Sequence, residues 1–328
     1  MRVSQATSEK AAIHAITNGT NVTFTPKGSA PINVVLNAGE TYKYAGGGTD
    51  ITGSTIVASN PVAVFSGHTC ARVPEPIVAC DTLLEQMIPN NNLSSNYLLT
   101  ASKGAQFASR RTDLVRVIAA QPGTVVTRDG VVVATLLNVG DVHQFQLAAG
   151  AGTRVQTSAP AMVAQYLEGG QGGNQTDPAL SLVPGSDTWL KSYRLSTPTG
   201  AAAFDQNYAS IVINTADLGS LTLNGVGVNT AAFSGIAGTS FSRGIIDLPL
   251  GLFDLAATNP FLVMLGGGES FDSYFTYGGS TFAPGVSPPV DPPPPVNGVP
   301  EPASLALLGL GLAALGFARR RRQPAEKM

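Results

Sequence analysis

Polar and apolar residues alternate through most of this chain, with the two-residue period of a β-strand that buries one face. The alternation is clear at Val22-Thr23-Phe24-Thr25 and again over residues 271–277. Helical periodicity is nearly absent before Ala303. The short exception is residues 81–87, where Asp81 is placed to cap a helix N-terminus. The pattern therefore predicts an all-β body with one short helix candidate.

Turn residues mark where these strands begin and end. Asp129-Gly130 lies between two apolar runs and predicts a two-residue hairpin turn. Further strands are expected directly after Pro61 and Pro160, at positions where the missing proline N–H is tolerated.

The strand and turn pattern recurs along the chain. A strand ending in Leu36-Asn37-Ala38-Gly39-Glu40 has a counterpart ending in Leu137-Asn138-Val139-Gly140-Asp141, and a looser copy contains Thr222-Leu223-Asn224-Gly225. A recurrence of this length indicates repeated β units. We predict tandem β-sandwiches, or alternatively one composite of the repeats, with units near residues 15–100, 110–195 and 205–282.

The C-terminal part has a different composition. Residues 283–299 are rich in proline, which holds a backbone extended, so we expect a semi-rigid linker after a body that spans residues 1–282. Residues 303–318 carry no charge and would span about 24 Å as a helix, somewhat less than a bilayer core. Four arginines follow, and such a block holds the C-terminal end of a membrane segment on the cytoplasmic side. The sequence predicts a single C-terminal transmembrane-type helix, anchored by Arg319, Arg320, Arg321 and Arg322.

Pro300-Glu301-Pro302, the apolar run and the arginine block together resemble the PEP-CTERM sorting signal of bacterial surface proteins. The resemblance implies export and transient retention in the inner membrane by residues 300–322. It also implies processing near Pro300, Glu301 and Pro302 by an exosortase-type enzyme, with residues 323–328 as a short tail. The implied destination is the envelope or exterior of a Gram-negative bacterium. Residues 1–6 lack the apolar core of a signal peptide, so we expect that the sequence as given begins inside its first domain.

Composition agrees with an extracellular β protein. Charged residues make up only 12% of the chain, and 37 glycines with 23 prolines provide many turns. Residues 319–328 contain five basic residues and one acidic residue, so the remaining residues, 1–318, have a net charge of −6. An acidic body without a basic patch is not expected to bind nucleic acid.

The two cysteines, Cys70 and Cys80, are ten residues apart. In an exported chain, an even pair at close spacing favours a disulfide. The alternative is a metal site in which His68 and Asp81 join two thiolates. His68 is also a candidate residue of a ligand-binding loop.

The block Gly67-His68-Thr69-Cys70, continued by Cys80-Asp81 and supported by Val163-Ala164-Gln165-Tyr166 and Asp177-Pro178-Ala179-Leu180, resembles the IgGFc-binding protein N-terminal domain family. The resemblance covers residues 18–279. It implies an extracellular, non-catalytic, β-rich module of the kind found in adhesive and mucin-like proteins.

The residues needed for catalysis are scarce. Only His14, His68 and His143 provide imidazole bases, and no Gly-x-Ser-x-Gly elbow accompanies them. We therefore expect no enzyme and no cofactor, but an exported adhesive or structural binding module with extracellular polysaccharide or surface proteins as partners. The alternative is a secreted carbohydrate-active or other hydrolytic enzyme, which two carboxylates about 5–10 Å apart in a cleft would support.

Overall fold

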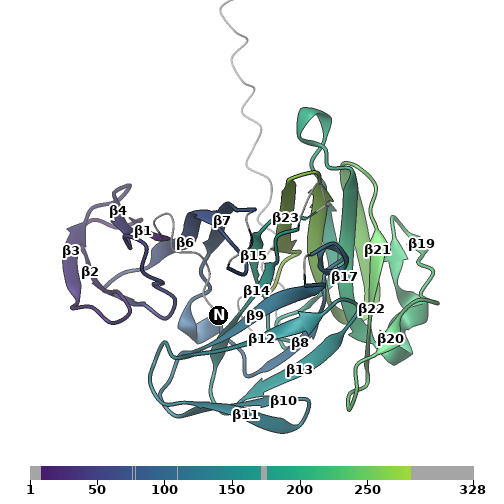
Figure 1. Ribbon diagram of the computed structural model, residues 1–328, viewed down its shortest axis with the longest axis horizontal. Coiled ribbons are helices and arrows are strands. Elements are labelled where there is room, and N and C mark those ends of the chain that lie inside the picture. The colour runs from purple at the N-terminus through teal and green to yellow at the C-terminus, as the bar shows by residue number, and fades with distance from the viewer. Residues whose placement is uncertain (1–8, 76, 78, 109, 171–175, 282–328) are drawn as a thin grey trace, which may run out of the picture. The chain divides into compact units, whose positions relative to one another are not determined.

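The computed structural model describes residues 9–281 apart from 76, 78, 109 and 171–175. The chain divides into a unit of residues 1–287 and a second unit of residues 288–328. The predicted proline-rich linker, sorting segment, C-terminal helix and arginine anchor lie outside the described residues. Within the described part, no helix has the length and apolar character needed to cross a bilayer. Figure 1 shows the described strands of the first unit.

The first seven strands form two antiparallel sheets, which we call the first module. Their bounds are β1 (Glu9–Ala15), β2 (Thr20–Thr25), β3 (Ile32–Leu36), β4 (Thr41–Ala45), β5 (Thr55–Ala58), β6 (Val62–Ala71) and β7 (Asp81–Gln86). One sheet has the order β4-β1-β6-β7 and the other the order β3-β2-β5. Ile13 and Phe24, both 0% exposed, lie in the core that the two sheets enclose.

The second module repeats this arrangement with one strand more. Its strands are β8 (Asn96–Thr100), β9 (Thr112–Ala119), β10 (Thr124–Arg128), β11 (Val131–Leu136), β12 (Val142–Ala148), β13 (Gly152–Thr157), β14 (Ala161–Leu167) and β15 (Ala179–Leu182). Short 3-10 turns precede and follow β8: η1 (Asn90–Asn92) and η2 (Gly104–Gln106). The sheets have the orders β12-β9-β14-β15 and β11-β10-β13-β8.

The third module contains a long strand shared by both sheets. Its elements are β16 (Leu190–Ser196), η3 (Gly200–Ala202), β17 (Gln206–Asn214), η4 (Thr215–Ser220), β18 (Thr222–Leu223), β19 (Val226–Gly227), β20 (Ser234–Gly235), β21 (Phe241–Asp247), β22 (Leu252–Glu269) and β23 (Asp272–Tyr277). The first half of β22 pairs with β16 and β18, and its second half pairs with β17 and β23. One strand of 18 residues thus takes the places that β13 and β14 occupy in the second module.

The modules share local chemistry as well as strand order. The Tyr97 hydroxyl donates to the Ala161 carbonyl at 2.5 Å and accepts from the Ser94 N–H at 3.1 Å. The Tyr193 hydroxyl likewise donates to the carbonyl of Phe261 and accepts from the N–H of Leu190, at the same two distances. We propose from this recurrence that the body consists of related β-sandwich units.

The all-β prediction is confirmed, and the helix prediction for residues 81–87 is wrong. This segment is β7, which pairs with β6. Leu83 is 4% exposed and Leu84 is 66% exposed, the alternation of a strand with one buried face. The hydrogen bonds and packing offered by β6 outweigh the weak helix propensity of a segment of this length.

The turn predictions are confirmed. Asp129 and Gly130 join β10 to β11 with φ angles of 50° and 84°, as a two-residue hairpin requires. Strands β6 and β14 begin directly after Pro61 and Pro160, whereas Pro260 lies inside the long strand β22.

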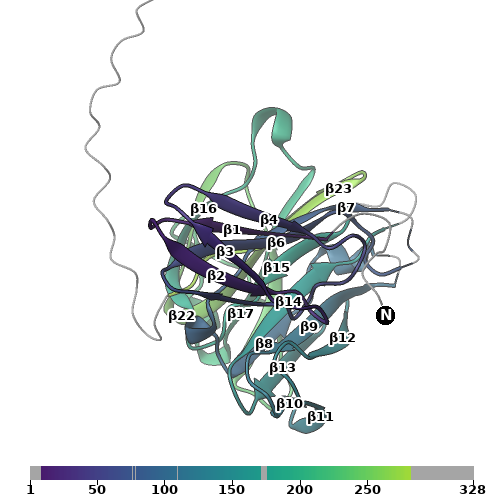
Figure 2. The ribbon, with the colours of Figure 1, turned by 90° about the vertical axis from the view of Figure 1, so that its left-hand side faces the viewer.

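The last strands of the modules meet. Strand β15 contacts both β7 and β23, and Figures 1 and 2 both draw the three strands close together. Leu83 of β7, Leu182 of β15 and Tyr166 of β14 belong to one buried cluster at this junction. The modules are therefore joined by a continuous apolar core here.

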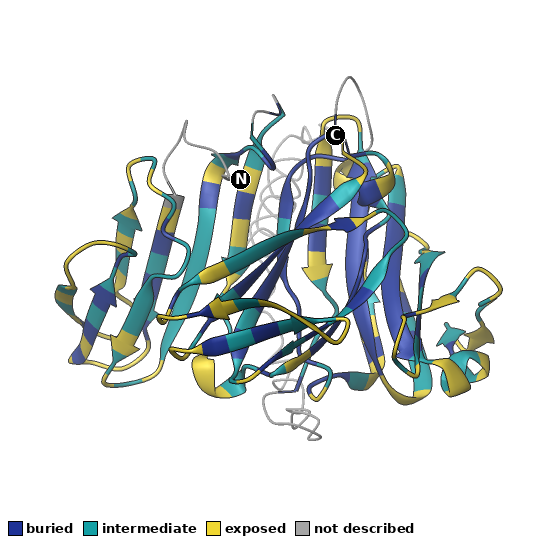
Figure 3. Ribbon diagram, turned by 60° about the horizontal axis from the view of Figure 1, so that its bottom comes forward, coloured by how far each residue is buried: buried dark blue, intermediate teal, exposed yellow. Residues whose placement is uncertain are grey.

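The second and third modules also share a core. Val212, Leu262 and Met264 of the third module belong to the same buried cluster as Leu99 and Val155 of the second. Residues 207–213 are consecutively buried for this reason, because β17 is covered on one face by its own module and on the other by its neighbour. Figure 3 shows such continuous buried bands beside strands whose residues alternate between buried and exposed.

Candidate functional site

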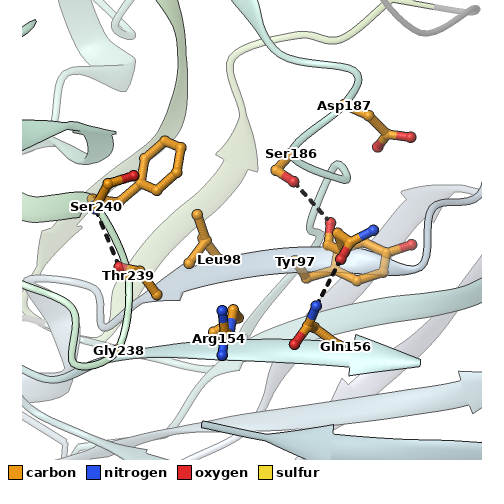
Figure 4. A pocket seen from close by; sticks show the side chains of 11 residues that line it. Tyr97, Leu98, Arg154, Gln156, Ser186, Asp187, Gly238, Thr239 and Ser240 are labelled. Carbon is orange, nitrogen blue, oxygen red and sulfur yellow. Dashed lines mark hydrogen bonds between the residues drawn. The ribbon is translucent and has the colours of Figure 1, made fainter. Parts of the chain in front are cut away.

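A polar hollow lies between the second and third modules (Figure 4). Strands β8 and β13 form one wall, and the turn between β20 and β21 forms another. The cavity has a volume of about 450 Å³. Its polar lining includes Asn96, Arg154, Gln156, Ser186, Asp187, Thr239 and Ser240.

Arg154 is the one cationic side chain of this lining. Its Nε is shielded from solvent and has no hydrogen-bond partner among the described residues. Its backbone is engaged with Asp129: the Arg154 N–H donates to Asp129 Oδ1 at 2.9 Å, and the Arg154 carbonyl accepts from the Asp129 N–H at 2.9 Å. A guanidinium carries five donors, so Arg154 retains the capacity to bind an anion or a cluster of hydroxyl oxygens.

The neighbouring polar groups hold one another in place. Gln156 Nε2 donates to Asn96 Oδ1 at 3.1 Å, and the Ser186 hydroxyl donates to the Asn96 carbonyl at 3.3 Å. Figure 4 shows these side chains along one side of the hollow, with Thr239 and Ser240 on the turn opposite. The hollow therefore presents a pre-arranged amide pair beside an unpaired guanidinium.

A second cluster lies where the last strands of the modules begin. Asp81 and Asp272 are the first residues of β7 and β23, and Asp177 lies two residues ahead of β15. The Ser273 hydroxyl joins two of these segments, because it donates to the Asp177 carbonyl at 2.6 Å and accepts from the Asp177 N–H at 3.2 Å. We call Asp81, Asp177 and Asp272 the acidic junction.

The carboxyls of the acidic junction influence one another. Asp177 is only 6% exposed, and its Oδ1 has no hydrogen-bond partner among the described residues. Burial, followed by the negative charges of Asp81 and Asp272, raises the pKa of Asp177 to about 7. Burial and the charge of Asp272 also raise the pKa of Asp81. Within the described ranges, no group of three His, Cys, Asp or Glu side chains is placed to hold a metal ion.

The cysteine pair lies beside this junction. Cys70 of β6 and Cys80 form a disulfide with a Cα–Cα separation of 5.0 Å, so the alternative of a thiolate metal site is wrong. His68 is 4% exposed, and its Nδ1 accepts from the Cys70 N–H at 3.0 Å. This contact fixes the backbone that carries Cys70, and a ligand role for His68 stays a prediction.

The other predicted site residues cannot be placed. Pro300, Glu301 and Pro302 lie outside the described residues, as does the arginine block at residues 319–322. The predicted roles of these residues are therefore not tested by the geometry.

Arg154 and the acidic junction were not found from the sequence. The junction has a signal, because Asp-Thr, Asp-Pro and Asp-Ser pairs at residues 81, 177 and 272 each precede an apolar strand. Aligning the last strand of each repeat would have shown the shared aspartate. Arg154 has no such signal, since its hollow depends on a turn contributed some 85 residues later, at residues 238–240.

Comparison with known proteins now identifies the family. A family model described as IgGFc binding protein matches residues 3–267, which is most of the chain. The chain belongs to the IgGFc-binding protein family. A second model, for the PEP-CTERM protein-sorting motif, matches residues 298–322. Both resemblances drawn from the sequence are confirmed.

The individual relatives are distant. The human IgGFc-binding protein is 26% identical over 202 residues, which cover 61% of this chain and 4% of that protein. The central fibronectin-III array of RIM-binding protein covers 87% of this chain and 98% of its own at 12% identity, with a TM-score of 0.15, too low to support an argument about the fold.

The sorting motif indicates the destination of this member of the IgGFc-binding protein family. Its sorting motif marks it for export through the membrane to the cell envelope or the extracellular space of a bacterium, with processing by an exosortase. Its family is one of binding proteins. Because the chain spans only 4% of the human relative's length, what it binds has to be argued from its own residues.

Proposed function

We propose that this protein is an exported adhesive module that binds extracellular polysaccharide in the hollow around Arg154. The observation that carries the proposal is the unpaired, half-buried guanidinium of Arg154 among fixed amide and hydroxyl groups. A partly buried cation without a partner has a desolvation cost that an anionic ligand would offset.

The lining suits a carboxylated sugar. Arg154 can bind a uronic-acid carboxylate through two parallel hydrogen bonds. Asn96, Gln156 and Thr239 provide donors and acceptors for ring hydroxyls, and the ring of Phe241 gives the hollow an apolar surface. The volume of about 450 Å³ falls within the usual range of small-ligand sites and has room for one or two sugar units.

The C-terminal segments would present this site at the cell surface. We propose that the linker at residues 283–299 spaces the body from the membrane and that the segment at residues 300–322 is held there until an exosortase acts on it. A cell envelope of the Gram-negative type is part of this proposal. The match of residues 298–322 to the sorting motif supports the membrane retention and the processing by an exosortase.

A hydrolytic enzyme is the second candidate function, and the acidic junction is the observation in its favour. Carboxyls whose pKa values are raised by burial and by one another are common in active sites. None of the three aspartates of the acidic junction lies in the lining of the Arg154 hollow or of the smaller cavity around Asp50 and Arg116. Release of reducing ends from a panel of polysaccharides, lost in Asp177→Asn, would establish the enzyme.

The binding proposal is tested on the full chain with immobilised neutral and carboxylated polysaccharides. We expect saturable binding to a carboxylated polymer and binding at least about tenfold weaker for Arg154→Gln, equivalent to about 1.4 kcal/mol. The matched control is Arg194→Gln, which makes the same charge change at an exposed arginine paired with Asp254. Equal losses of affinity in both variants would show that only the overall charge of the protein matters for binding. Binding that is unchanged in Arg154→Gln would refute the site.

A further inference from the structure

A second arginine, Arg243 of β21, lies beside the strand that forms one wall of the Arg154 hollow. The odd-numbered residues 153, 155 and 157 of β13 are buried in the core of their module, so Arg154 and the Cβ position of Gly152 face the opposite side of the sheet. A Cβ built on Gly152 would lie 3.0 Å from Arg243 Cγ and 2.9 Å from Ile236 Cγ1. The stem of Arg243 therefore crosses β13 over this glycine, two positions from Arg154.

The Arg243 guanidinium lies beyond this crossing. Its Nη2 is 3.9 Å from the position of a Cβ built on Gly150, in the turn that leads into β13. Four residues of extended chain, the separation of Gly150 from Arg154, span at most roughly 13 Å. The two arginines therefore follow one another along the same stretch of chain, with Arg154 in the lining of the hollow and Arg243 outside it.

No carboxylate balances Arg243 in the described part of the chain. Its side chain is half-buried, and no ion pair or hydrogen bond between described residues engages its guanidinium. Burial lowers the pKa of Arg243, and no charged neighbour opposes this effect. Arg116 and Arg194, by contrast, pair with aspartates. An unpaired, partly desolvated guanidinium retains its donors for an anion from another molecule.

The charges along this wall change from negative to positive. At one end Gln156 lies opposite Asn96, and the segment that carries the exposed Asp187 is bonded to the Asn96 carbonyl. Figure 4 shows Asp187 on this side of the hollow. Arg154 comes next along β13, and Arg243 follows. An anionic chain in the hollow is therefore repelled by Asp187 and attracted towards the two arginines.

We propose that Arg243 is a second anion-binding residue and that the ligand is a polyuronate, whose carboxylates on different sugar units bind Arg154 and Arg243. This proposal specifies the polysaccharide-binding function proposed above and rests on it. A polymer with isolated uronate units offers one carboxylate to the hollow, whereas a polyuronate offers both arginines a partner on the same chain. Two contacts joined in one molecule raise the affinity even when each contact is weak. The affinity should therefore rise with chain length until the oligomer reaches Arg243.

The test measures binding of galacturonate and mannuronate oligomers, from monomer to hexamer, to the full chain. NMR titration suits the monomers and calorimetry suits the longer oligomers. We expect the hexamers to bind at least about tenfold more tightly than the monomers. Arg243→Gln should weaken hexamer binding at least about fivefold, whereas a monomer held at Arg154 should bind as in the unaltered chain. Unchanged monomer binding also shows that the variant keeps its fold.

Three controls separate this contact from overall charge. Arg243→Lys keeps the charge without the planar fork, so it should lose less hexamer affinity than Arg243→Gln. Arg194→Gln makes the same charge change at an exposed arginine paired with Asp254 and should leave the advantage of the hexamer over the monomer unchanged. Hexamers whose carboxyls are reduced to alcohols should bind equally weakly to the unaltered chain and to Arg243→Gln.

The outcomes distinguish this proposal from the one on which it rests. If Arg243→Gln binds the hexamers as tightly as the unaltered chain does, while Arg154→Gln binds all uronates more weakly, the polysaccharide site stands and the role of Arg243 is refuted. Equal losses for monomer and hexamer in Arg243→Gln would refute that role as well. If no uronate of any length binds the unaltered chain, both proposals are refuted.

Discussion

Gly53 and Gly140, in turns of the first and second modules, approach so closely that a Cβ built on either would lie 2.0 Å from the carbonyl oxygen of the other. Both have positive φ angles, 90° and 77°. On either side of this contact, Lys27 pairs with Asp141 at 3.0 Å and Arg116 pairs with Asp50 at 3.1 Å. The two turns therefore meet backbone to backbone, and no side chain fits between them.

Gly140→Ala should destabilise the protein more than its counterpart Gly39→Ala. Gly39 holds the same place in the first module's turn and has a φ of 85°, but a Cβ there meets nothing within 4 Å. The Gly39→Ala control should lower the free energy of unfolding by about 1–2 kcal/mol, because alanine is strained in a left-handed backbone conformation. Gly140→Ala should lose about 1–3 kcal/mol more because the facing turn must move. Urea unfolding measures both, and equal losses would show that the contact between the turns contributes nothing.

The bridging tyrosines provide a second prediction. Tyr97→Phe and Tyr193→Phe should each lower the free energy of unfolding by about 1–3 kcal/mol, since each leaves an N–H and a carbonyl unsatisfied out of solvent. Tyr42→Phe is the control. Its ring is half-buried like many others, and no described hydrogen bond uses its hydroxyl. Thermal melts should show a shift for the first two variants and almost none for the third.

The disulfide gives a third prediction. Cys70→Ser should lower the free energy of unfolding by about 2–3 kcal/mol, because opening so short a loop frees the unfolded chain only moderately. The double variant Cys70→Ser/Cys80→Ser should match the single one, which would show that a remaining thiol has no effect. Unfolding that is insensitive to both changes would mean that the loop is held by its other contacts.

Much of the fold could be predicted because its signals are local. Asp129-Gly130 forces a hairpin through its own backbone angles. The Leu-Asn-x-Gly turns also have a glycine with positive φ, at Gly39 and Gly140, and they lead the chain from one sheet of a module to the other. The helix prediction for residues 81–87 was wrong because a cap residue and a Leu-Leu pair fit a helix as well as a strand. The pairing with β6 decides in favour of the strand.

The sites were less predictable because they depend on contacts between modules. Arg154 has no unusual sequence context, and its hollow exists only because the turn before β21 lies across from β13. The raised pKa of Asp177 likewise depends on Asp81 and Asp272, which are 96 and 95 residues away in the sequence. The disulfide was predictable because the chain has just two cysteines.

The acidic junction predicts a pH dependence. The pKa of Asp177 is raised to about 7, so the folded state binds this proton more tightly than the unfolded state does. The stability that protonation confers is present in full below pH 4 and is lost as the pH rises through about 7. Asp177→Asn should therefore be more stable than the unaltered chain at pH 8, by roughly 1–2 kcal/mol, and the difference should shrink as the pH falls to 5 and disappear only below about pH 4.

Other groups titrate in the same range, so only the difference between the two proteins is informative. Burial raises the pKa of Glu85 to about 7 and that of Asp113 to about 6, while burial lowers the pKa of His143. These contributions are common to the chain and to Asp177→Asn, and they cancel in the comparison. Denaturant unfolding at pH 5, 6, 7 and 8 measures the difference in unfolding free energy between the two proteins. A difference that is independent of pH would contradict a raised pKa at Asp177.

The sorting segment makes the last prediction, on processing in a host that has an exosortase. Replacing Pro300, Glu301 and Pro302 by alanine should leave the chain unprocessed and retained in the membrane, because the recognition segment is lost while the apolar run stays intact. The matched control replaces Pro74, Glu75 and Pro76, the same three residue types in a segment of the body with no apolar run after it, and should be processed normally. Immunoblots of membrane and culture fractions separate the two outcomes by size and location. Normal processing of the first variant would show that the enzyme recognises the apolar run and arginine block without this triplet.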